Sequence, residues 1–140
     1  GVTVKNAAWR RAARSYAQNV DAVLDEFDRL VREADRLEGD YLTPLPEREA
    51  THSAALILIL NHPEMRSAFV QKFGEMIRGH DSELLEYCMH ELRWPEVKVQ
   101  VEAAIREADD FRARDHFTSV LTAFTDRWSG RGFYERFPEL

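Results

Sequence analysis

LNHPEMR at residues 60–66 and LRWPEVK at residues 92–98 follow one pattern at an offset of 32 residues. The leucine, the proline and the glutamate are identical, and Met65/Val97 and Arg66/Lys98 keep their chemical character. Proline followed by glutamate favours the first turn of a helix, because proline has no amide hydrogen to leave unpaired there and glutamate lies near the positive helix end. A fixed period of this size indicates stacked helical hairpins. Residues 47–109 are therefore predicted to be one two-helix unit present twice.

Apolar residues at helical spacing extend this pattern to the whole chain. They predict six helices, over residues 6–38, 47–60, 63–78, 82–93, 95–108 and 111–128. The predicted fold is all-α, with a long first helix packed on two helical hairpins; a plain helical bundle is the alternative. We expect one domain over residues 1–140, in which residues 39–46 form a proline-containing linker. Residues 129–140 form an aromatic tail that docks on the body or, as the alternative, on a partner.

The apolar run Ala54–Leu60 has no polar face. A helix that is apolar all round is expected to be buried on all sides. The first hairpin is therefore predicted to form the centre of the core, and the second an outer layer.

The first predicted helix carries an apolar seam that lasts about four heptads. Its members are spaced four and three residues apart: Trp9, Ala13, Tyr16, Val20, Val23, Phe27, Leu30, Ala34 and Leu37. The simpler interpretation is that the seam packs on the later helices of the same chain. The alternative is a homodimer through the 9–37 seam, because the seam is longer than the surface that one small domain offers.

Charges on this helix are segregated. The first 20 residues contain no acid but several bases, namely Lys5, Arg10, Arg11 and Arg14. Bases in a first turn oppose the helix dipole, so they do not stabilise the helix. They are interpreted as a patch for an acidic partner, or as an ordinary solvated face. A nucleic-acid interface through this patch is a third alternative, but the formal charge of −6 argues against it.

Composition excludes several classes of protein. An apolar share of 44% in 140 residues is that of a folded domain, not of a disordered chain. A single cysteine, Cys88, excludes a disulfide framework and a cysteine-rich zinc site. The longest apolar run has seven residues, whereas a membrane span needs about 20, so no membrane association is expected. With no secretory signal pattern, a cytoplasmic location is the default expectation.

The two turns resemble those of HEAT-type helical repeats, in which Pro-Glu-Val-Arg often follows a short polar turn. The resemblance rests on residues 61–68 and 94–98 and covers about 63 of the 140 residues. The chain departs from the family pattern in its shorter period, and residues 1–39 are not a repeat unit. The resemblance implies a protein-binding scaffold, because stacked helical pairs expose a concave face.

Several histidines suggest a metal site as an alternative. Glu49 and His52 have the i, i+3 spacing of ferritin-like ligands, but no second motif of this kind exists in the chain. The pair His80-Asp81 resembles that of metal-dependent phosphohydrolases, although here it falls at a predicted helix boundary, where Asp81 is also a plausible cap. The set for a metal-dependent helical hydrolase of this type would be His52, His80, Asp81 and His116.

The favoured function is a non-catalytic protein-interaction or regulatory domain without a catalytic site, metal or cofactor, binding another protein or itself. The predicted partner-binding residues are His90, Glu91, Trp94, Arg10, Arg11 and Arg14. His90 corresponds to Leu58 in the first hairpin, so it is expected to be partly buried, with Glu86 as its partner.

Overall fold

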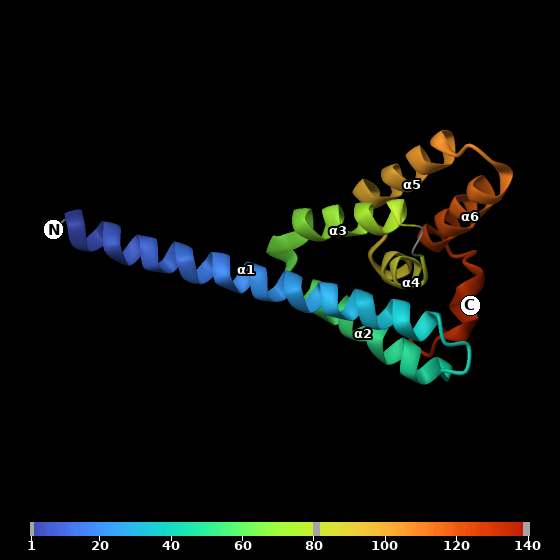
Figure 1. Cartoon of the computed structure of the whole chain (residues 1–140), viewed down its shortest axis with the longest axis horizontal. Helices are drawn as coiled ribbons and strands as arrows, with labels where there is room; N and C mark the ends of the chain where they lie inside the picture. The colour runs from blue at the N-terminus through green and yellow to red at the C-terminus, as the bar shows by residue number, and fades with distance from the viewer. Residues whose placement is uncertain (1, 80–81, 139–140) are drawn as a thin grey trace.

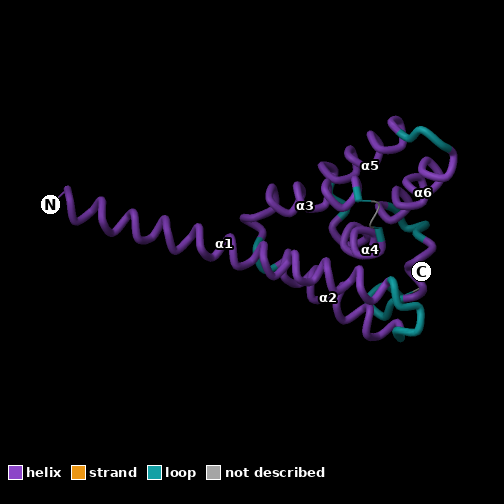
Figure 2. The backbone as a smooth tube through the Cα atoms, viewed as in Figure 1, coloured by secondary structure: helices purple, strands orange, loops and turns teal. Residues whose placement is uncertain are grey.

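The structure, a computed structural model, describes residues 2–79 and 82–138, with side chains from residue 6 onward (Figure 1). Its six α-helices are α1 (Val2–Glu38), α2 (Leu45–Leu60), α3 (Arg66–Arg78), α4 (Glu83–Leu92), α5 (Pro95–Glu107) and α6 (Phe111–Leu121). Short 3₁₀ helices cover Pro63–Met65, Thr122–Phe124 and Ser129–Phe133. The described residues contain no strand, and the predicted all-α class with six helices is confirmed (Figure 2).

α1 extends well beyond the rest of the molecule (Figure 1). It begins at Val2, before the predicted start at residue 6. It ends at Glu38, where the Gly39 amide donates to the Asp35 carbonyl at 3.0 Å, as expected for a glycine after the last turn. The other helices gather around the C-terminal half of α1.

That half of α1 enters the core through Phe27. Phe27 is fully buried, and its ring meets Phe69 and Phe73 of α3 edge-on at centroid distances of 5.3 and 5.7 Å. Edge-on pairs of this kind add to the free energy of apolar burial. The seam positions Val23, Leu30, Ala34 and Leu37 are buried beside Phe27.

α4 lies at the centre of the body, surrounded by the other elements (Figure 1). Its buried residues are Leu84, Leu85, Tyr87, Cys88, Met89 and His90. The prediction that residues 54–60 would be buried on all sides is wrong, because Ile57 and Leu60 of α2 are each 48% exposed. α2 lies on the outside against α1 and α4 and buries one face only, so the second hairpin, not the first, supplies the central helix.

α3 and α5 lie side by side and run in the same direction. At their starts, Arg66 donates two hydrogen bonds to Glu96, both at 2.8 Å, and its guanidinium lies 4.8 Å from the centroid of the Trp94 ring. Further along, the amide end of the Gln100 side chain lies against Gly74, in space that a Cβ at this position would occupy. Equivalent turns in contact are what stacked hairpins would produce, and membership of the HEAT class stays a prediction.

The C-terminal end of the chain differs from the predicted helix 111–128. α6 is capped by Asp110, whose carboxylate accepts from the Ala113 amide at 2.8 Å, but it ends at Leu121. The Ala123 carbonyl accepts from a side chain of α4, and Thr125 is extended at φ −131°, so the helical ladder cannot continue. The tail then docks as predicted through Tyr134 and Phe137, which are buried.

Candidate functional site

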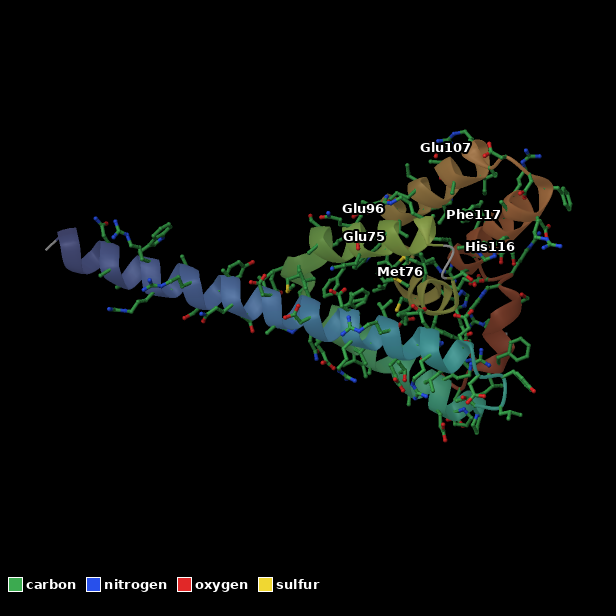
Figure 3. All side chains as sticks on the ribbon, viewed as in Figure 1. Glu75, Met76, Glu96, Glu107, His116 and Phe117 are labelled. Carbon is green, nitrogen blue, oxygen red and sulfur yellow. The ribbon has the colours of Figure 1, made fainter. Side chains whose placement is uncertain are left out.

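Residues 6–20 of α1, which we call the arm, have no neighbouring element in the described part of the chain. Every arm residue is exposed except Val20, which lies half-buried at the edge of the body. The seam residues Trp9 and Tyr16 are 73% and 58% exposed, unlike the buried seam positions from Val23 onward. Figure 3 shows the arm's side chains standing free in solvent on all sides. The arm is thus a bare amphipathic helix.

The arm also carries several arginines. Arg10, Arg11 and Arg14 are all exposed, whereas the side chain of Lys5 lies outside the described residues. The first acids of the helix, Asp21 and Asp25, follow at its edge with the body and are exposed as well. The arm therefore combines exposed aromatic rings with positive charge, a combination enriched where proteins bind one another.

A second group of functional side chains lies inside the body, around Glu83 at the start of α4. Its carboxylate accepts from the Arg48 guanidinium at 2.6 Å, and its other oxygen lies 3.1 Å from both His52 Nε2 and the Tyr134 hydroxyl. Burial disfavours the charged form of Glu83, but the contacts with His52 and Arg48 outweigh it and hold its pKa below the usual value. Both oxygens are occupied, so the carboxylate joins α2, α4 and the tail.

Glu49 of α2 also binds the tail. Its carboxylate accepts from the Tyr87 hydroxyl at 3.0 Å and from the tail amides of Glu135 and Arg136 at 2.9 and 3.2 Å. A shallow hollow of about 490 Å³ opens beside it, between the start of α2 and the tail. Because the Glu49 carboxylate is already hydrogen-bonded to the tail, we infer that it holds the tail in place and takes no part in a reaction.

His90 lies 3% exposed against the tail, not on the surface. Arg131 has only donors, so its guanidinium donates to His90 Nε2 at 2.6 Å, and Nδ1–H must donate to the Ala123 carbonyl at 2.8 Å. The predicted partner of His90, Glu86, instead accepts from Trp128 Nε1 at 3.1 Å. Burial, with help from Arg131, lowers the pKa of His90. His90 therefore contacts the tail as a neutral ring.

The other predicted partner-binding residues of this region are divided between core and surface. Trp94 is buried beneath Arg66, whereas Glu91 is exposed and pairs with Arg136 of the tail at 3.1 Å. His90 and Trp94 therefore present little surface to a partner in this structure. Of the six predicted residues, the three arginines of the arm and Glu91 remain accessible.

The predicted metal set is not brought together by the described residues. His52 is buried against Glu83, and His116 lies on α6 beside Phe117 (Figure 3). His80 and Asp81 lie outside the described residues. Within residues 2–79 and 82–138 no group of three or more histidine, cysteine, aspartate or glutamate side chains could hold a metal ion.

The sequence interpretation did not anticipate the Glu83 cluster. A signal was present in α2, where Arg48, Glu49, His52 and Ser53 place polar groups on one face of an otherwise apolar helix. Their hydrogen-bond partners lie 31 to 87 positions away in the sequence, beyond the reach of any helical periodicity.

Comparison with known proteins adds no identity. No protein-family model matches the chain, and neither a curated protein nor a solved structure shows significant similarity to it. In the described part of the chain, no helix combines the length and apolar character that a membrane span requires.

Proposed function

We propose that this chain is a non-catalytic protein-interaction domain whose binding surface is the arm. The observation that supports it is the exposure of Trp9 and Tyr16, at 73% and 58%, on a seam that is buried further along the same helix. Burying large aromatic side chains lowers the free energy, so a partner surface that covers Trp9 and Tyr16 would bind favourably.

The helix of the arm is also poorly stabilised by its own sequence. Its three arginines, Arg10, Arg11 and Arg14, have no acid in the first 20 residues with which to pair. An isolated helix of this length is marginal in water unless something packs against it. Binding to a partner would supply the missing packing, so we expect the arm to become more rigid when it binds.

The body is better explained as a scaffold than as an enzyme. The carboxylates of Glu49, Glu83 and Glu86 all accept hydrogen bonds from within the chain, mainly from the tail and the residues that lead into it. Groups that are hydrogen-bonded in this way hold the tail against α2 and α4, so we assign these three carboxylates to structure and not to general acid–base chemistry.

Site-specific photo-crosslinking tests this proposal. p-Benzoylphenylalanine would be incorporated at the position of Tyr16, on the seam, or of Gln18, on the exposed opposite face, in cells that produce the chain. We expect a discrete protein adduct from the Tyr16 position and much less from the Gln18 position. Equal labelling from both positions, or no protein adduct from either, would contradict the proposal.

A further inference from the structure

We propose that the tail is a pH-sensitive strap, which protonation of His90 loosens from α4 while the rest of the body stays folded. This device is separate from the arm and does not depend on the function proposed for it. Three features of the described residues lead to it: the way in which the tail is held, the hydrogen bonds of the His90 ring and the charges around that ring.

The tail is held to the body mainly through side chains. It runs past α4 toward the start of α2 (Figure 1). Its described backbone–backbone hydrogen bonds are local, as from the Phe137 amide to the Tyr134 carbonyl at 3.3 Å. Its hydrogen bonds to the body, with that of the preceding Trp128, go to ionisable side chains of α2 and α4: Glu49, Glu83, Glu86, His90 and Glu91. The tail can therefore open without breaking the backbone ladder of any helix.

Three buried rings keep the tail docked at neutral pH. Trp128, Tyr134 and Phe137 are each at most 8% exposed. The rings of Tyr134 and Phe137 both meet the fully buried ring of Tyr87 at a centroid distance of 5.0 Å. Contacts between buried rings stabilise the docked state. Loosening the tail would uncover Tyr87 and the carboxylates around it, so the strap keeps an aromatic and acidic face of α4 closed.

Both ring nitrogens of His90 are occupied when the ring is neutral. Nε2 accepts from the Arg131 guanidinium at 2.6 Å, and Nδ1–H donates to the Ala123 carbonyl at 2.8 Å. A protonated imidazole carries hydrogen on both nitrogens and accepts from neither. Protonation therefore breaks the hydrogen bond from Arg131 and leaves two cations in contact. Since the His90 ring is 3% exposed, water can replace the lost contact only when the tail moves.

The groups that surround His90 oppose a positive charge on its ring. Burial disfavours the charged form most, and Arg131 of the tail and Arg93 of α4 act in the same direction. Asp126 and the Ala123 carbonyl favour the charged form, but the Asp126 carboxylate is already paired with Arg93 at 2.8 Å. The balance lowers the pKa of His90 in the docked state. A ring that is released from the tail regains a higher pKa, so acid favours release.

Glu86, one turn before His90, acts in the opposite direction. Its carboxylate accepts from Trp128 Nε1, and the Trp128 ring lies 4.8 Å from the His90 ring. Burial raises the pKa of Glu86, so the docked state takes up this proton more readily than the released state. Protonation of Glu86 therefore favours docking, and the test has to separate the two groups.

The three tryptophans let one NMR experiment follow the arm, the body and the tail separately: Trp9 is exposed on the arm, Trp94 is buried in the body, and Trp128 leads into the tail. Hydrogen exchange of the Trp128 indole and of the Glu135 and Arg136 amides is measured in the full chain at about pH 7.5 and about pH 5.5, and corrected for the intrinsic pH dependence of exchange. Protection of these groups should fall by about five- to tenfold at the lower pH, because a released imidazole has an ordinary pKa of 6.5. Protection of the Trp94 indole should stay unchanged.

His90→Gln removes the titrating group and keeps both hydrogen bonds. The amide oxygen can accept from Arg131, and the amide nitrogen can donate to the Ala123 carbonyl. Protection of the tail in this variant should not change between the two pH values. His62→Gln is the matched control, because His62 lies in the turn after α2 beside Glu64. It should keep the response of the parent chain.

Glu86→Gln separates the second group. It keeps an oxygen that accepts from Trp128 and removes the titration that opposes release. The loss of tail protection at the lower pH should be as large as in the parent chain, or larger. Disappearance of the response in this variant would show that Glu86 and not His90 controls the tail, and would overturn the proposal.

The ring nitrogen shifts of His90 in the parent chain give a check that needs no substitution. The docked ring should carry its hydrogen on Nδ1 and should gain a second hydrogen only as Trp128 loses protection. Protonation of His90 while Trp128 stays protected would overturn the proposal. So would equal tail protection at both pH values, or a loss of protection that Trp94 shares, since the latter means that the whole body unfolds.

Discussion

The two halves of α1 carry one continuous seam but have opposite surroundings. Between Val23 and Leu37 the seam is buried, with Phe27 fully enclosed between Phe69 and Phe73. Between Trp9 and Tyr16 it is in solvent. The spacing of apolar residues is the same in both halves, so spacing specifies which face of a helix is apolar and does not specify what covers that face.

The two halves also differ in how their charges are used. In the covered half, Arg29 donates two hydrogen bonds to Glu26, and Arg36 donates two to Glu33, in pairs three residues apart. Such pairs stabilise a helix by a few tenths of a kcal/mol each, even when exposed. The arm has bases but no acids. The covered half thus has charge pairs within its own helix, which the arm lacks.

The largest expected difference between the halves is their contribution to folding. Phe27→Ala should lower the free energy of unfolding by about 3–5 kcal/mol, because it removes a fully buried ring and leaves a cavity. Trp9→Ala should change it by less than about 0.5 kcal/mol in dilute solution, where the arm is unpaired. Urea denaturation followed by circular dichroism measures both. A comparable loss from both substitutions would mean that the arm packs on the body.

Lowering the pH should reduce the free energy of unfolding of the body, because it protonates His90 beneath the tail. It should not affect the exposed seam of the arm. In the folded chain the pKa of His90 lies below its ordinary value of 6.5, because of burial and the adjacent Arg131. The unfolded chain therefore takes up a proton first as pH falls. The free energy of unfolding should decrease below about pH 6.5, by on the order of 1 kcal/mol, and should be fully present above it.

Arg131→Gln provides the test of that acid response, since it removes the cation that opposes protonation of His90. Its loss of stability between neutral and mildly acidic pH should be smaller than in the parent chain. Arg127→Gln, a change of the same kind at an exposed neighbouring position, should keep the parent response. If both variants respond alike, His90 and Arg131 are not the source of the acid sensitivity.

The fold was predictable from sequence where local rules act. The six helices, the helix start at Pro95 and the docking of the aromatic tail through Tyr134 and Phe137 follow from nearby residues and were confirmed. The exposed side of α2 was not predicted, because the burial of Ile57 depends on which helices occupy the centre.

Contacts across long stretches of chain explain the other errors. The break after Leu121 depends on a hydrogen bond from His90, 33 residues before Ala123. The Glu83 cluster joins residues up to 51 positions apart. For the arm, the sequence predicted the seam and the basic residues correctly as local features. It left open where along the helix the body would stop covering the seam.

A substitution that gives the arm the charge pattern of the covered half should make its helix more stable. Ala7→Glu places an acid three and four residues before Arg10 and Arg11, in the order that favours pairing. We expect a stabilisation of about 0.2–0.5 kcal/mol, seen as slower amide hydrogen exchange at residues 9–16 in dilute solution. Ala7→Gln keeps the size of the side chain without its charge and should slow exchange much less.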